Sequence, residues 1–69
     1  MVDDIAYYLK FLDGVTKEEF RSMTRPSGLA WANYMLLRLR RKEWIEFRRG
    51  KWYVTQLGRA AYRQYLGLK

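Results

Sequence analysis

Apolar residues recur every three or four positions near the start of the chain, at Ile5, Tyr8, Leu9 and Leu12. This spacing predicts a first helix over residues 3–13, which Gly14 ends. The next segment carries a capping-box pattern, in which Thr16 caps a helix and Glu19 reaches back to it. We therefore predict a short second helix over residues 16–23.

The third predicted helix is the longest, over residues 27–42, and Ser27 is a suitable N-cap for it. One face of this helix is apolar and would pack inward; it carries Leu29, Ala32, Met35, Leu36 and Leu39. The opposite face carries Ala30, Tyr34, Leu37, Arg38 and Arg41, with Trp31 and Asn33 at its sides. The side chains of this second face would therefore be exposed to solvent.

From Trp44 to Thr55 the pattern changes to alternation, which predicts a two-stranded hairpin over residues 44–55. Arg49 and Gly50 suit a two-residue turn, because glycine readily adopts the positive φ that such a turn needs. Pairing through this turn places Phe47 and Ile45 opposite Trp52 and Val54 on one face. The other face would then carry Glu46, Arg48, Lys51 and Tyr53.

Thr55 can cap a final helix over residues 56–66, with Gly67 as its stop. The residues of this helix expected to face inward are Leu57, Ala61 and Tyr65. The order of elements is helix, helix, helix, hairpin, helix, with no repeat and no linker. It predicts one domain over residues 1–69, of the α+β class and mostly helical.

Composition argues against several classes of function. The chain has no Cys and no His, so it lacks disulfides, thiolate metal sites and the usual acid–base group near neutral pH. Its acidic residues cluster where helices are predicted to begin, and they form no nucleophile–base pair or metal-ligand set. We therefore expect no enzymatic activity, no metal, no cofactor and no small-molecule substrate.

The net charge of +7 is unevenly distributed along the chain. Residues 1–19 carry five acidic and two basic side chains, whereas residues 20–69 carry two acidic and twelve basic ones. A basic segment of this kind favours a polyanionic partner, of which nucleic acid is the commonest. A solvated basic surface, as in proteins of heat-loving organisms, is the alternative explanation. Without a long apolar run or a signal peptide, we expect a cytoplasmic protein with no membrane segment.

Two motifs resemble those of the winged-helix branch of the helix-turn-helix family. The segment Leu39–Ile45 (LRRKEWI) is similar to the passage from that family's recognition helix into its first wing strand, although the family usually has glycine where this chain has Glu43. The segment Trp52–Arg59 (WYVTQLGR) is similar to the family's aromatic-x-aliphatic-Thr-x-x-Gly ending. The resemblance covers about Val2–Leu66. It implies a winged helix-turn-helix fold with three helices, a two-stranded wing and a C-terminal helix.

That resemblance implies a sequence-specific transcriptional regulator that binds double-stranded DNA. Helix 27–42 would enter the major groove, and the wing, residues 47–52, would contact the backbone or the minor groove. Asn33 could pair with adenine, and Arg38 could pair with guanine or reach a phosphate. Trp31 could instead pack against the second helix. The residues expected at the DNA are Ser27, Ala30, Trp31, Asn33, Tyr34, Arg38, Arg41, Arg48, Arg49 and Lys51.

The chain is also similar in its brevity to small regulators of archaea and their viruses or plasmids, for which the host cytoplasm would be the location. Winged domains commonly bind DNA as two-fold dimers, so a homodimer is expected. The residues that could line its interface are Tyr7, Tyr62, Tyr65 and Leu66. The same residues could equally cover the core of the monomer.

Two other functions remain open at this point. A winged helix can serve as a protein-interaction module, because a fold does not determine a function. The chain could also bind RNA, or bind DNA without sequence preference as an architectural protein. The presence of Asn33 and Tyr34 on the exposed helix face favours base reading over contact with the backbone alone.

Overall fold

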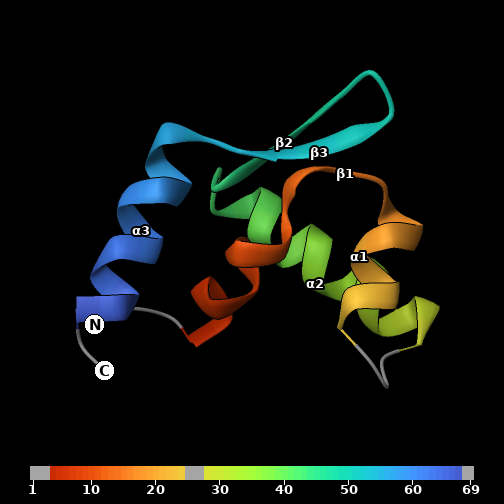
Figure 1. Cartoon of the computed structure of the whole chain (residues 1–69), viewed down its shortest axis with the longest axis horizontal. Coiled ribbons are helices and arrows are strands. Elements are labelled where there is room, and N and C mark those ends of the chain that lie inside the picture. Colours follow the sequence, from red (N-terminus) through yellow and green to blue (C-terminus); the bar gives the residue numbers. More distant parts are fainter. Residues whose placement is uncertain (1–3, 25–27, 68–69) are drawn as a thin grey trace.

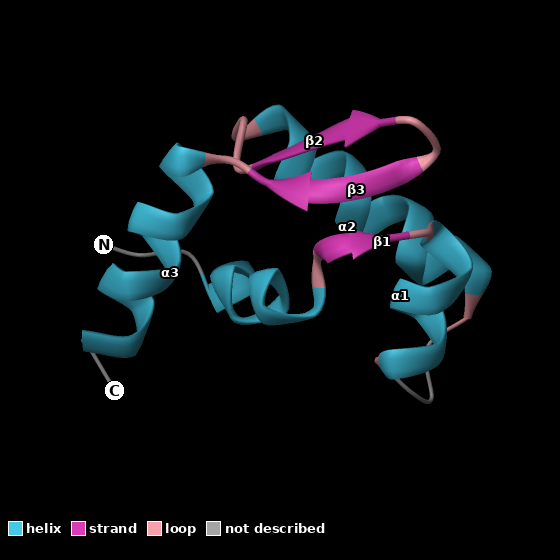
Figure 2. Cartoon of the chain, turned by 45° about the horizontal axis from the view of Figure 1, so that its top comes forward, coloured by secondary structure: helices cyan, strands magenta, loops and turns pink. Residues whose placement is uncertain are grey.

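The computed structural model describes residues 4–24 and 28–67 and confirms a mostly helical α+β architecture (Figures 1 and 2). In chain order, the elements are η1 (Asp4–Phe11), β1 (Asp13–Val15), α1 (Lys17–Met23), α2 (Leu29–Arg41), β2 (Ile45–Arg48), β3 (Lys51–Val54) and α3 (Gln56–Gly67). The hairpin formed by β2 and β3 runs from the start of α3 across α2 toward α1. Helix α3 packs along η1.

The first helix is a 3₁₀ helix, so the helix predicted over residues 3–13 has a different geometry and is shorter than expected. Side chains three positions apart share one face of a 3₁₀ helix. Ala6, Leu9 and Leu12 follow this spacing, and all three are buried. Leu9 and Leu12 also belong to the α-helical spacing in the sequence, so the pattern of apolar residues did not separate the two helix types.

A third strand, β1, was not predicted. It pairs antiparallel with β3, which gives the sheet order β1-β3-β2, and it aligns Asp13 with Tyr53 and Val15 with Trp52. Gly14 lies inside this strand at an irregularity in the register, with φ of 77° and with the Tyr53 ring packed against it. A strand of three residues with a central glycine carries too little alternation to be recognised from sequence.

The capping box at the start of α1 is confirmed. The Thr16 hydroxyl accepts a hydrogen bond from the Glu19 N–H at 3.1 Å, and the Glu19 carboxylate accepts one from the Thr16 N–H at 2.8 Å. Hydrogen bonding to the Glu19 carboxylate, first from the Thr16 backbone N–H and then from the Thr16 side chain, holds the pKa of Glu19 below its ordinary value, and the charge of Lys51 acts in the same direction. The cap therefore depends on the ionised form of Glu19.

Acidification is expected to destabilise this cap. Because the folded-state pKa of Glu19 is lowered, its stabilising effect is complete above the ordinary pKa near 4.5 and is lost as the pH falls through the folded-state value. The midpoint temperature of thermal unfolding, measured by circular dichroism, should thus decrease when the pH is lowered below about 4.5. Glu19→Gln, which cannot titrate, should show a smaller fall than the wild type. An equal pH dependence in both proteins would show that Glu19 contributes nothing to it.

Helix α2 begins later than predicted. Its N-cap is Gly28, so the assignment of Ser27 as the N-cap was wrong; Ser27 itself lies outside the described residues. The first helical hydrogen bond runs from the Ala32 N–H to the Gly28 carbonyl at 3.1 Å. Leu29, which was expected to face inward, is 45% exposed because it occupies the first helical position, at the end of the packed face.

The core lies between the inner face of α2 and the elements around it. The predicted inward residues Ala32, Met35, Leu36 and Leu39 are all buried there. The other elements contribute Ile5, Ala6, Leu9, Leu12, Phe20, Ile45 and Ala61. On α3 the prediction for Leu57 was wrong: Leu57 is 54% exposed and its neighbour Gly58 is buried. The helix approaches the core through its smallest residue, which turns Leu57 outward.

The exit from α2 is a Schellman motif with glutamate where glycine is usual. Glu43 has a φ of 61°, its N–H donates to the Arg40 carbonyl at 2.8 Å, and the Trp44 N–H donates to the Leu39 carbonyl at 3.2 Å. The chain therefore makes the glycine-type turn of the resembled motif without the glycine. A left-handed backbone costs an L-residue about 1–2 kcal/mol.

Glu43→Gly is therefore expected to raise the free energy of unfolding by about 1 kcal/mol. Glycine adopts the positive φ without strain, and its greater freedom in the unfolded chain offsets part of the gain. Urea denaturation followed by circular dichroism would measure the change. Glu43→Ala is the matched variant, since it removes the same carboxylate and keeps the Cβ. An equal stabilisation by both substitutions would assign the effect to charge and not to backbone strain.

Thr55 joins this exit to the start of α3. Its hydroxyl donates to the Glu43 carbonyl at 2.7 Å and accepts from the Gly58 N–H at 3.0 Å, which confirms the predicted cap. Its backbone N–H donates to the Trp44 carbonyl at 2.9 Å. These bonds hold the α2–β2 corner against the β3–α3 corner, and so they set how the hairpin lies relative to α2.

Candidate nucleic-acid interface

The outward face of α2 carries the side chains predicted for it. Five residues of this face are exposed, namely Ala30, Asn33, Tyr34, Leu37 and Arg41. A sixth residue of the face, Arg38, is partly buried. Arg38 donates from Nη1 to the Tyr34 hydroxyl at 3.3 Å, and its guanidinium lies 5.7 Å from the centre of the Tyr34 ring. These contacts orient Arg38 along the helix, which reduces the side-chain entropy it would lose on binding.

Trp31 does not belong to this outward face. Its ring stacks on Phe20 of α1 at 5.8 Å and meets the edge of Tyr8 of η1 at 5.1 Å. Trp31 is therefore half-buried and packs against the second helix, which is the alternative to a contact with DNA. Its ring fixes the angle at which α2 leaves α1.

The hairpin has the register and the turn expected from its sequence. Phe47 pairs with Trp52 and Ile45 with Val54. Both turn residues have positive φ, 51° at Arg49 and 80° at Gly50, as a type I′ turn requires. The tip is well exposed and carries the cations Arg49 and Lys51.

Arg48 is held on the outer face of the hairpin. Its guanidinium lies 4.4 Å from the centre of the Tyr53 ring, and its Nε is 3.4 Å from a Glu46 carboxylate oxygen. Both side chains of this ion pair are at least half exposed, so the pair contributes little to stability. It keeps Arg48 lying along the strand and leaves Arg49 and Lys51 as the cations at the tip.

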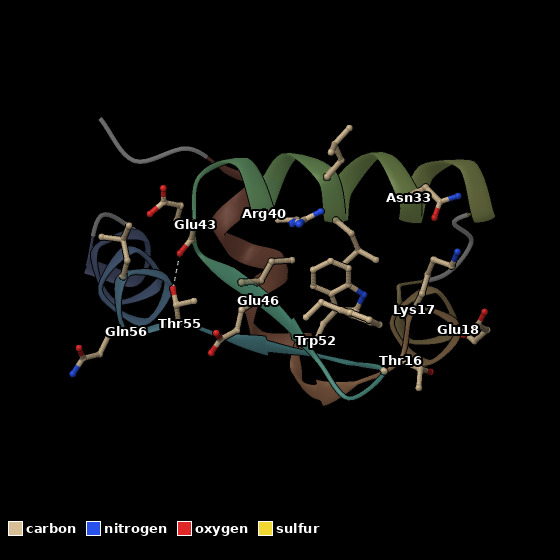
Figure 3. A pocket seen from close by; sticks show the side chains of 16 residues that line it. Thr16, Lys17, Glu18, Asn33, Arg40, Glu43, Glu46, Trp52, Thr55 and Gln56 are labelled. Atoms are coloured by element: carbon tan, nitrogen blue, oxygen red, sulfur yellow. Dashed lines mark hydrogen bonds between the residues drawn. The ribbon is translucent and has the colours of Figure 1, made fainter.

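A groove of about 1130 Å³ runs between α2 and the hairpin (Figure 3). Its α2 wall consists of Asn33, Leu36, Leu37 and Arg40, and its hairpin wall includes Ile45, Phe47 and Trp52. The groove ends at the starts of α1 and α3. It brings the outward face of α2 and the turn of the hairpin, through Gly50, to the two sides of one open surface.

Charges are ordered along this groove. Figure 3 shows Arg40 and Trp52 in its middle, and Glu43 and Glu18 at opposite ends. Glu46 also borders the groove but pairs with Arg48 of the outer hairpin face. The middle of the groove is therefore aromatic and cationic, one end carries Glu43, and the other end carries Lys17 beside Glu18.

Arg40 and Phe47 are the groove residues that sequence reasoning did not single out. Arg40 follows Asn33 and Leu36 at helical spacing, so a signal for it was present on the flank of α2. Phe47 was placed on the inner face of the hairpin, yet it is 55% exposed because that face extends beyond the core and over the groove. Alternation gives the face of a strand but not the distance to the element opposite.

The aromatic residues proposed for a dimer interface lie on η1 and α3. Tyr65 contacts the rings of Tyr7 and Tyr62, with ring centres 6.3 Å and 6.4 Å apart. Tyr65 and Tyr62 are partly buried by these contacts, whereas Tyr7 and Leu66 remain 36% and 51% exposed. Part of this cluster therefore packs within the monomer, and Tyr7 and Leu66 remain exposed.

Among residues 4–24 and 28–67, no group of three His, Cys, Asp or Glu side chains could hold a metal ion. None of the helices in the same part of the chain has the length and apolarity needed to cross a membrane. No family model, curated protein or solved structure matches the chain.

Proposed function

We propose that this chain is a winged helix-turn-helix domain that binds double-stranded DNA in a sequence-specific manner. In this proposal α2 enters the major groove and the hairpin is the wing, which contacts the backbone or the minor groove. The observation that carries it is that the outward face of α2 and the turn of the hairpin border one open groove, and that exposed cations lie on both. A duplex presents its major groove and its phosphates side by side, which suits such a surface.

The dimensions and side chains of α2 support this role. A helix of 13 residues is about 20 Å long and fits a major groove that is about 12 Å wide. Ala30 is small and exposed near its start, where the helix would come closest to the bases. Asn33 suits adenine and Arg38 suits guanine, whereas Arg41 suits a phosphate. The N-terminus at Gly28 would favour a phosphate as well.

As a regulator of transcription, the protein would act as a homodimer on two half-sites, as such domains commonly do. The exposed part of the aromatic cluster, Tyr7 and Leu66, is the surface proposed for the contact between the two copies. This surface lies on η1 and α3, apart from the groove residues of α2 and the hairpin. Dimerisation there would leave both DNA-contacting elements free.

The test is a titration of the protein onto fluorescent duplexes, followed by anisotropy at several salt concentrations. If four to six cations per protomer neutralise phosphates, the logarithm of the affinity should fall with the logarithm of the salt concentration, with a slope of about −3.5 to −5.5. Duplexes enriched from a random pool should bind more tightly than unrelated ones. Equal binding to all duplexes would indicate an architectural protein. No binding at low salt would reject DNA binding and favour a protein-interaction module.

A further inference from the structure

The groove between α2 and the hairpin contains an aromatic surface, formed by Phe47 beside Trp52. Phe47 lies 4.9 Å from Trp52, between ring centres, and it is 55% exposed. Burying such a ring would stabilise the fold, yet the hairpin presents it to an open groove. An exposed aromatic surface bounded by polar groups is typical of a binding site.

The chemistry of the groove suits a nucleobase. A base has a flat π-surface that stacks on an aromatic ring, and it has donors and acceptors along its edge. The α2 wall supplies the Asn33 amide and the Arg40 guanidinium, which can bond to such an edge. Leu37, which is 45% exposed, adds an apolar contact on the same wall.

A nucleotide strand also needs a place for its phosphates. The groove itself carries both signs of charge, since Lys17 stands beside Glu18 at one end and Arg40 lies in the middle. The exposed cations Arg49 and Lys51 lie at the hairpin tip beside Gly50, which borders the groove. A nucleotide strand is thus complementary to this surface when its phosphates run over the tip and its neutral base points inward.

We infer that the groove binds an unpaired base of single-stranded DNA, stacked on Phe47, with Arg40 and Asn33 at the edge of the base. The inference rests on the proposed function to the extent that the hairpin cations hold the DNA backbone. It adds that the protein binds single strands, or duplex that has opened locally, in addition to closed duplex.

The experiment compares an unstructured DNA strand of about 12 nucleotides with the same strand annealed to its complement, by anisotropy at fixed low salt. Phe47→Ala should weaken binding of the single strand by about 5- to 150-fold, because stacking on one aromatic ring contributes roughly 1–3 kcal/mol. Its effect on the closed duplex should stay within about twofold. Phe47→Tyr keeps the ring and should bind the single strand like the wild type. Met23→Ala removes another half-exposed apolar side chain, on α1 and outside the groove, and is the matched control.

The outcomes separate this inference from the proposed function. Binding to duplex without binding to the single strand would overturn the inference and leave the proposed function in place. So would an equal loss of both affinities in Phe47→Ala, provided circular dichroism shows the variant to be folded. Preference for an RNA strand of the same sequence would also overturn it. Binding to neither form of DNA would reject both proposals.

Discussion

Replacing Gly58 with alanine is expected to lower the free energy of unfolding by about 2 kcal/mol or more. A Cβ at this position would overlap the Trp44 carbonyl and lie 2.9 Å from the Val54 side chain. The Trp44 carbonyl cannot easily move, because it accepts the hydrogen bond from the Thr55 N–H. Overpacking costs about 1–3 kcal/mol and occasionally more, and an overlap with fixed backbone belongs at or above the upper end of that range. The better helix propensity of alanine recovers about 1 kcal/mol at most, which leaves a net loss of about 2 kcal/mol or more.

Thermal unfolding followed by circular dichroism would measure this loss. For a domain of this size, 2 kcal/mol corresponds to a decrease of about 8–16 °C in the midpoint. Gly67→Ala is the matched control, since Gly67 lies in the same helix and has no neighbour near the position of a Cβ. Gly67→Ala should leave the midpoint unchanged or raise it slightly. A Gly58→Ala protein that unfolds at the wild-type temperature would show that the two corners are not rigidly packed.

The second large effect is expected at Arg38. If Arg38 reads guanine, Arg38→Ala should weaken binding to the preferred duplex by about 5- to 150-fold, which is the loss of roughly 1–3 kcal/mol for one bidentate base contact. Binding to an unrelated duplex should change far less, so the preference between the two would largely disappear. Tyr34→Phe removes the hydroxyl that accepts from Arg38 and should cause a smaller loss in the same direction.

A variant of the hairpin tip shows how the loss of a phosphate contact differs from the loss of a base contact at Arg38. Arg49→Ala should weaken binding to every duplex by a similar factor and should reduce the salt slope by about 0.9, because it removes one phosphate contact. Arg63→Ala, on α3, removes the same charge from outside the groove and should change neither quantity by more than about twofold. If Arg38→Ala behaved like Arg49→Ala, Arg38 would be a phosphate contact and not a base-reading residue.

The parts of the fold that were predicted correctly are those in which a local pattern has one physical solution. The reciprocal bonds of Thr16 and Glu19 satisfy N–H groups within one turn of helix, and a two-residue turn at Arg49 and Gly50 permits one strand register. The errors occurred where tertiary packing decides. Leu57 is more apolar than Gly58, but only Gly58 allows α3 to approach the Trp44 carbonyl.

The same division applies to the candidate interface. Helical spacing identified the exposed face of α2, because the opposite face is apolar throughout. The groove could not be predicted, because its width depends on how Thr55 and Gly58 hold the two corners together. Its distinctive residues, Arg40 and Phe47, are ordinary in sequence and acquire a role only when α2 and the hairpin face each other.

The position of β1 in the sheet has a consequence for the order in which the chain can fold. β1 pairs with β3 across a separation of 40 positions, at Asp13 and Tyr53, whereas β2 and β3 are joined by a two-residue turn. Closing the long loop costs more entropy than closing the turn. During synthesis, β1 therefore remains unpaired until β3 has been made and has left the ribosome. Pairing of β1 with β3 is then a late step of folding, which follows the formation of the hairpin.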